Sequence, residues 1–209
     1  MALVSKELQH QLIDHDHLQQ QLAALPSTQV LKAALQAGQS QLDDIFQEHK
    51  EKRINELIHA RAWLVDQILR IAWQQYSWPE EAALVAVGGY GRRELHPQSD
   101  VDLLILLGNG LDASSWHRCT QEFITFIWDL GLQIGSSVRT LEDCCEQAKN
   151  DITIATSLIE SHTIIGKAEL REQAFDWVIS EQAWGNEAFY KARIESQQQR
   201  HRRTNDTEY

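Results

Sequence analysis

The chain has 209 residues, of which 43% are hydrophobic and 23% are charged, proportions that are ordinary for a soluble globular protein. Its formal net charge of −11 argues against a large nucleic-acid interface, because phosphate neutralisation requires a basic surface. The sequence has no run of the roughly 18 apolar residues that a membrane span needs, and its first residues do not resemble a signal peptide. We therefore expect a soluble protein that binds neither nucleic acid nor membranes.

The three cysteines indicate a cytoplasmic protein. Cys119, Cys144 and Cys145 are odd in number and lack the spacing of a metal site. A reducing compartment is the simplest environment for such a set.

The first third of the chain predicts helices. Leucines recur at helical spacing in residues 5–24, and Ser27 follows Pro26 as a candidate helix cap. Gly38 is expected to interrupt the helical pattern. From residue 40 to 76 apolar residues return at helical intervals, a pattern that one long amphipathic helix would satisfy.

Two short apolar strands follow, joined by a glycine turn and a polar loop. The first covers 84–87 and ends at Gly88-Gly89, and the second covers 101–107. Asp100 and Asp102 stand at the start of the second strand. Because strand side chains alternate, these two carboxylates face the same way, at a cost unless a cation lies between them.

The residue types around this turn predict chemistry on phosphates. Carboxylate oxygens such as those of Asp100 and Asp102 are ligands that magnesium prefers. Gly88-Gly89 allows the backbone to approach an anion closely, and Arg92 offers a planar fork for phosphate oxygens. Together these residues indicate phosphoryl or nucleotidyl transfer.

Further helices and one more strand are expected downstream. Ser114 or Ser115 is a candidate cap for a helix that stops at Gly131. Residues 132–139 predict a third strand beside the aspartate pair. Two helical regions then cover 141–161 and 167–199.

Two charged runs have unremarkable interpretations. Asp14-His15-Asp16-His17 contains the letters of a metal-binding pair, but it lies in a Gln-rich helical region and is expected to be a solvated face. The basic run 200–203 is expected to be an exposed helix end, with a contact to the triphosphate as the alternative.

The segment GGYGRRELHPQSDVDLLIL at 88–106 resembles the nucleotidyltransferase motif of bacterial PII uridylyltransferases, within the superfamily that shares its fold with DNA polymerase β. Ten residues separate Gly89 from Asp100, close to the spacing in that superfamily. The segments 131–144 and 157–167 and the helix around Asp66 are also similar to this family.

The resemblance implies an α+β fold, with a polymerase-β-like nucleotidyltransferase core built on a small mixed sheet and with helices before and after it. We expect an N-terminal helical region at 1–78, the nucleotidyltransferase core at 79–165 and a C-terminal helical segment at 166–209. Family members also carry HD and ACT domains, for uridylyl removal and glutamine sensing. The chain is therefore expected to be the N-terminal transferase part of a longer protein.

The resemblance also implies an activity and a site. The reaction would move UMP from UTP to a tyrosine of the PII signalling protein and release pyrophosphate. Asp100 and Asp102 would be the catalytic residues and would hold two Mg²⁺ ions. The residues expected to bind the nucleotide phosphates are Gly88, Gly89, Arg92 and Ser99.

The chain departs from the family pattern at two places. Arg93 stands where many relatives have a small residue, and it is expected to face solvent or to add positive charge near the phosphates. A third carboxylate is expected from the strand at 132–139, but that segment has none, and Glu142 and Asp143 lie beyond it. Either a third acid comes from elsewhere or two carboxylates suffice.

Several questions stay open at this point. Glu94 is either a salt-bridge partner of Arg92 or a functional contact, and His96 is expected to be structural rather than a substrate contact. No residue identifies the base, so an adenylyl transferase with another acceptor is one alternative. A nucleotide-binding regulatory module without catalysis is another.

Overall fold

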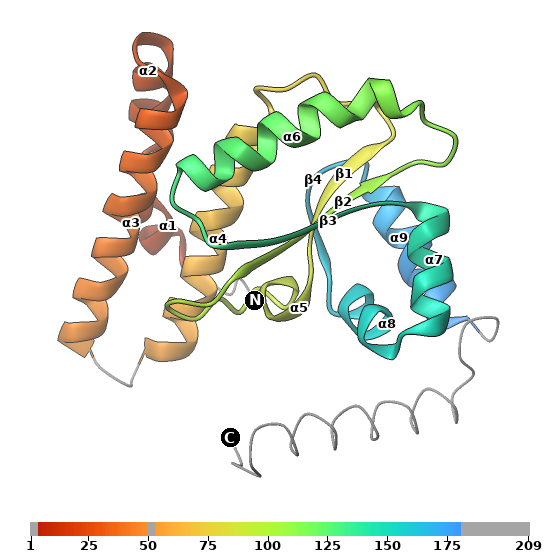
Figure 1. Ribbon diagram of the computed structural model, residues 1–209. Coiled ribbons are helices and arrows are strands. Elements are labelled where there is room, and N and C mark those ends of the chain that lie inside the picture. The colour runs from red at the N-terminus through yellow and green to blue at the C-terminus, as the bar shows by residue number, and fades with distance from the viewer. Residues whose placement is uncertain (1–3, 50–52, 181–209) are drawn as a thin grey trace.

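The computed structural model of the protein describes residues 4–49 and 53–180 (Figure 1). The elements in chain order are α1 (Lys6–Leu12), α2 (His15–Ala24), α3 (Ser27–His49), α4 (Ile54–Trp73), β1 (Ala82–Ala86), α5 (Gly88–Gly91), β2 (Val101–Leu107), α6 (Ala113–Asp129), β3 (Ile134–Thr140), α7 (Leu141–Asn150), α8 (Ile152–Ile159), β4 (His162–Gly166) and α9 (Ala168–Ile179). Among these described helices, none is long and apolar enough to cross a membrane.

The four strands form one mixed sheet in the order β3-β2-β1-β4. β2 pairs with β3 in parallel, whereas β1 pairs antiparallel with both β2 and β4. Helices precede the sheet, follow it and cover it, as Figure 1 shows. The predicted α+β class with a small mixed sheet is confirmed.

Alternation along the strands divides the buried side chains between the two faces of the sheet. On β2, Leu103 and Ile105 join the large hydrophobic cluster that includes α4 and α6. Leu104 and Leu106 join a smaller cluster that includes α7, α8 and α9. By the same alternation, Asp102 projects from the face that α7, α8 and α9 cover.

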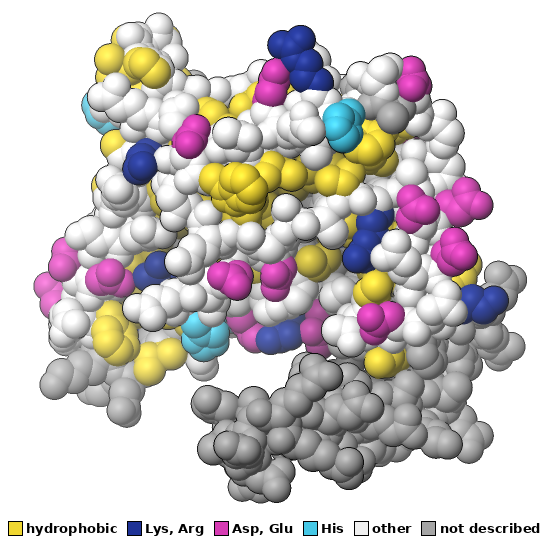
Figure 2. All heavy atoms as spheres, in the orientation of Figure 1, with side chains coloured by type: hydrophobic (Ala, Val, Ile, Leu, Met, Phe, Trp, Pro, Cys, Tyr) yellow, Lys and Arg dark blue, Asp and Glu magenta, His cyan; other side chains and the backbone are white. Residues whose placement is uncertain are grey.

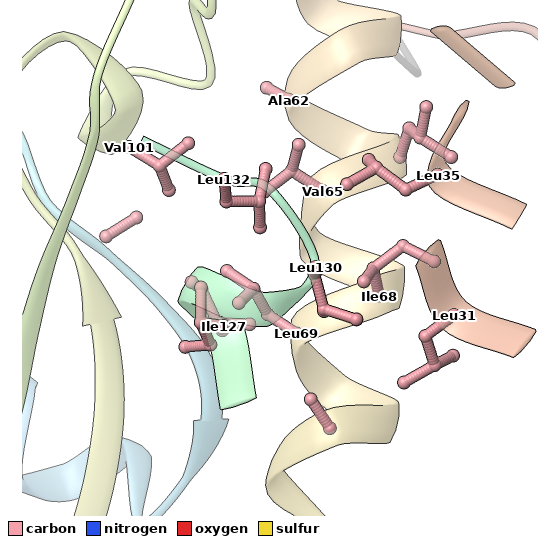
Figure 3. Packing of buried hydrophobic residues seen from close by; sticks show 14 of the residues in the cluster. Leu31, Leu35, Ala62, Val65, Ile68, Leu69, Val101, Ile127, Leu130 and Leu132 are labelled. Atoms are coloured by element: carbon pink, nitrogen blue, oxygen red, sulfur yellow. The ribbon is translucent and has the colours of Figure 1, made fainter. Parts of the chain in front are cut away.

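The large cluster joins the N-terminal helices to the sheet. In Figure 3 the side chains of α4 lie between those of α3 on one side and those of α6 and β2 on the other. The labelled residues are Leu31, Leu35, Ala62, Val65, Ile68, Leu69, Val101, Ile127, Leu130 and Leu132. Helix α4 is therefore covered on most of its surface, which explains why apolar residues occupy more of its circumference than in a helix with one face in solvent.

The amphipathic helical region predicted at 40–76 is confirmed, but it consists of two helices rather than the one long helix that the pattern would also satisfy. α3 ends at His49 and α4 begins at Ile54, and the two pack against each other. The apolar stripe of α3 stops at Phe46 and that of α4 starts at Ile54, so the polar run 47–53 separates the two helices in the sequence. Gly38 does not interrupt α3 but lies buried inside it, where an added Cβ would come within 2.7 Å of Leu64.

Helix ends downstream also differ from the prediction in detail. The cap of α6 is Asp112 and neither serine, since its carboxylate accepts a hydrogen bond from the Ser114 amide. Gly131 follows the end of α6 with φ of 88°, as expected for a glycine stop. The predicted helix at 141–161 is two helices, because Asp151 ends α7 and caps α8.

The strand predictions were close, with one omission. β1 runs from Ala82 to Ala86, and the glycine turn forms the short helix α5. β3 lies beside β2 as predicted. The sequence reading missed β4, which is short and lies at an edge of the sheet. Of the helix predicted at 167–199, α9 covers the first part, and the remainder and the basic run 200–203 lie outside the described residues.

Candidate active site

Three chain segments meet at one end of the sheet. β1 runs antiparallel to β2, so its last residue, Ala86, lies opposite Leu103 near the start of β2. β3 runs parallel to β2, so its first residue lies opposite Val101. The Val87 amide donates a hydrogen bond of 3.0 Å to the Asp102 carbonyl oxygen, which fixes the glycine turn beside the aspartate.

The Asp102 carboxylate lies between two glycines. A Cβ added to Gly88 would lie 2.8 Å from Oδ2 of Asp102, and one added to Gly135 would lie 2.5 Å from Oδ1. Gly88 also has a φ of 62°, which favours glycine. The two missing side chains therefore leave the space in which this carboxylate lies.

Asp100 and Asp102 are close enough to influence each other. Partial burial raises the pKa of the Asp102 carboxyl above its ordinary value, and the negative charge of Asp100 adds to this rise. Two hard oxygen donors with mutual repulsion, beside glycine backbone, fit divalent cations such as Mg²⁺.

The structure supplies no third acid from β3. Asp102 is paired in register with Gly135, and the next residues that face the same way are Ser137 and Arg139. Within residues 4–49 and 53–180, no group of three or more His, Cys, Asp or Glu side chains could hold a metal ion.

Arg92 lies beside the glycine turn and binds two glutamates. Its Nε is 3.0 Å from Glu94 and its Nη1 is 2.8 Å from Glu160, at the C-terminal end of α8. Its Nη2 would lie 3.9 Å from a Cβ added to Gly89, so the guanidinium extends along the turn. The interpretation of Glu94 as a salt-bridge partner is confirmed. Figure 2 shows acidic and basic side chains together over α5 on this face.

Ser99 lies next to Asp100 in the chain, but it lines a cavity whose lining includes neither member of the aspartate pair nor the glycine turn. Its side chain is exposed, and its amide donates to the His96 carbonyl oxygen in a turn. The cavity has a volume of about 670 Å³ and also reaches Arg61 of α4 and Gln133, before β3. The phosphate contact predicted for Ser99 stays a prediction.

The sequence reading assigned no role to a buried network directly behind the turn. The Asp66 side chain is 2% exposed and contacts three partners, Tyr90, Arg93 and His162. The Arg93 side chain is 43% exposed, as the solvent-facing prediction expects, but its Nη1 also lies 3.2 Å from Asp66, a contact that the prediction did not include. The sequence did contain one indication of this network: Asp66 is a charged residue among the apolar positions of α4, next to Val65.

The segment Asp14–His17 belongs to a helix start and not to a site. Asp14 caps α2 by accepting a hydrogen bond of 3.0 Å from the His17 amide, and all four residues are exposed. The solvated-face interpretation is confirmed.

Comparison with known proteins also indicates nucleotidyl transfer. Residues 65–157 match the nucleotidyltransferase domain family. The chain is 45% identical over 201 residues, 95% of its length, to a bifunctional uridylyltransferase/uridylyl-removing enzyme of Azotobacter vinelandii. Enzymes of the same name from Pseudomonas fluorescens and Ectopseudomonas mendocina are 44% and 42% identical over 95% and 97% of the chain. The chain spans only 22% to 23% of the length of these relatives.

Proposed function

We propose that this chain, which carries a nucleotidyltransferase domain and belongs to the family of bifunctional uridylyltransferase/uridylyl-removing enzymes, transfers UMP from UTP to a tyrosine hydroxyl of a PII signalling protein. The observation that supports the proposal is the position of the Asp102 carboxylate against Gly88, because a carboxylate suits a metal ion and a glycine turn suits a phosphate. The name of the relatives supports uridylyl as the group transferred.

Each part of the site has a role in the proposed reaction. The phenolic oxygen of the acceptor forms a bond to the α-phosphorus, the bond from that phosphorus to pyrophosphate breaks, and the phenolic proton passes to solvent. Gly88 and Gly89 bring backbone amides to the phosphates. Arg92 stabilises charge on the departing pyrophosphate through the guanidinium hydrogens that its glutamates leave available. Ser99 is the chain neighbour of Asp100, and we assign its hydroxyl a contact with a phosphate of the bound nucleotide.

Asp100 and Asp102 would hold two Mg²⁺ ions together with the nucleotide. When bound, these ions lower the pKa of the attacking hydroxyl and neutralise charge on the triphosphate. Without them, burial and then the charge of Asp100 raise the pKa of the Asp102 carboxyl above its ordinary value.

We place the reaction in the cytoplasm, where three free cysteines are stable. Glutamine sensing and uridylyl removal would require parts of the longer relatives that this chain does not span.

The test is transfer of label from α-labelled UTP to purified PII by this chain, with and without Mg²⁺. We expect labelled PII only with the metal, and less labelling from ATP than from UTP. Efficient labelling from ATP would favour the adenylyl alternative. Tight Mg·UTP binding without any transfer would favour a regulatory nucleotide-binding module.

A further inference from the structure

The turn that is proposed to bind phosphates rests on a buried charged network with no assigned role. Asp66 lies on α4 and is one of the few buried polar residues among those described. A buried carboxylate is costly unless its oxygens are well paired, so its partners indicate what it holds in place.

All three partners of Asp66 connect to the turn. Tyr90, within α5, donates its hydroxyl hydrogen to Oδ1 over 2.5 Å. Arg93, the second residue after α5, donates from Nη1 to Oδ2 over 3.2 Å. His162, at the start of β4, places Nε2 3.1 Å from Oδ2 and Nδ1 2.9 Å from the Gly91 carbonyl oxygen.

The His162 ring therefore bridges the carboxylate and the backbone of the turn. The Gly91 carbonyl oxygen can only accept a hydrogen bond, so Nδ1 carries a hydrogen toward it. The Tyr90 ring lies edge-on to the His162 ring at 5.8 Å. Burial, followed by the charge of Asp66, raises the pKa of Tyr90 well above its ordinary value, so its hydroxyl remains a donor at neutral pH.

Helix α4 holds the end of the turn at two more points. His59 Nδ1 donates to the Arg93 carbonyl oxygen over 2.7 Å, and the Leu95 amide donates to the Ile58 carbonyl oxygen. Arg93 has a φ of 63°, which is unfavourable for a residue with a side chain and persists only where the surroundings enforce it.

We propose that Asp66 is a positioning residue that fixes the backbone of residues 88–93 in the conformation that receives the nucleotide phosphates. The inference rests on the proposed function of that turn. Tyr90, Arg93 and His162 are the three groups through which Asp66 acts, and none of the four needs to touch the substrate.

Asp66→Asn tests this with little change of shape. The Asn oxygen can still accept from Tyr90, but the amide group loses the negative charge and presents hydrogens to Arg93, which is itself a donor. Two measurements on the full chain are compared: hydrogen exchange of the amides at 86–95, and the Kd of Mg·UTP. We expect faster exchange in the turn and binding weakened about tenfold.

Tyr90→Phe and Ile127→Ala complete the experiment. Tyr90→Phe keeps the ring and removes one hydrogen bond, so both effects should recur at smaller size, even if Asp66→Asn fails to fold. Ile127 is a buried apolar residue of α6 that has no polar group to join the network, so we expect its variant to lower Tm while the hydrogen bonds of the turn stay in place. Unchanged exchange and unchanged Kd in both network variants would overturn the inference. A wild-type chain that binds no Mg·UTP would refute the proposed function, and the exchange data would still decide the role of Asp66.

Discussion

Asp102 carries a conflict between function and stability. Its carboxylate is partly buried and close to Asp100, and both effects raise its pKa in the folded protein. A carboxylic acid whose folded-state pKa is raised destabilises the fold when ionised, and this penalty disappears as pH falls through that pKa. The metal-free site therefore stores unfavourable energy that a bound cation would relieve.

We expect Asp102→Asn to abolish most transfer and to leave the metal-free protein equally or more stable. The transfer rate should fall by several orders of magnitude, because a metal ligand is lost. The rise in Tm should be largest near neutral pH and should shrink in acid, where Asp102 of the wild type takes up a proton. Thermal unfolding across this pH range in a chelator, together with the transfer assay, provides the measurement.

Asp100→Asn serves as the matched variant. It should reduce transfer similarly and also remove one cause of the raised Asp102 pKa. A large stability loss with modest loss of transfer in either variant would mean that the aspartates are structural.

Gly135→Ala tests whether the position of the Asp102 carboxylate matters for transfer, independently of the stability of β3. An added Cβ would lie 2.5 Å from Oδ1 of Asp102, so the carboxylate must move. Alanine is a slightly better strand residue than glycine, so Tm should change little. We expect transfer to fall at least about tenfold, since small displacements of catalytic groups are costly.

Ser136→Ala is the control for that variant, because Ser136 neighbours Gly135 but is exposed and faces the other way. Full activity of Gly135→Ala would show that the position of the Asp102 carboxylate is not critical.

At the level of elements, α3 and α4 pack closely because one position between them has no side chain. Gly38 is buried, and an added Cβ would lie 2.7 and 2.9 Å from the two methyl groups of Leu64. Glycine lowers helix propensity, so its presence in the middle of α3 reflects this close contact.

We expect Gly38→Ala to destabilise the protein by about 1–2 kcal/mol, because overpacking outweighs the gain in helix propensity. Leu64→Ala alone should cost about 2–5 kcal/mol through the cavity that it leaves. The double variant should lose less than the sum, since the new methyl group enters that cavity. Urea unfolding of the four proteins measures the coupling, and strict additivity would contradict the contact.

For the whole molecule, ligand binding should be visible as stability. Helices α1–α4 share one hydrophobic cluster with the sheet, so the site and the N-terminal helices should unfold together. A nucleotide that binds only the folded chain stabilises it, by about 2.7 kcal/mol at a hundredfold excess over Kd.

We therefore expect Mg·UTP to raise the Tm of the whole chain in a single transition. EDTA should remove the shift, because the triphosphate would then face two uncompensated carboxylates. A shift that survives chelation would argue against a metal between Asp100 and Asp102, and a separate transition for the N-terminal helices would argue against the shared core.

The amino-acid sequence alone was sufficient for features that depend on neighbouring residues. The glycine turn, the aspartate pair and the strand beside it follow from local patterns, since glycine and apolar runs act within a few residues. Helix ends were harder: the polar run 47–53 interrupts the apolar pattern between α3 and α4 without identifying the residue at which either helix ends, and Asp112 rather than a serine caps α6.

Only the tertiary structure decided which distant residues complete the site. Asp66 and His162 are 96 residues apart, and Glu160 reaches Arg92 from α8, 68 residues away. No local pattern pairs such residues, because burial against a particular partner depends on how the sheet and helices pack. The same holds for the glycines at 88 and 135: each looks like an ordinary turn or strand glycine in the sequence, and only the fold places both against the Asp102 carboxylate.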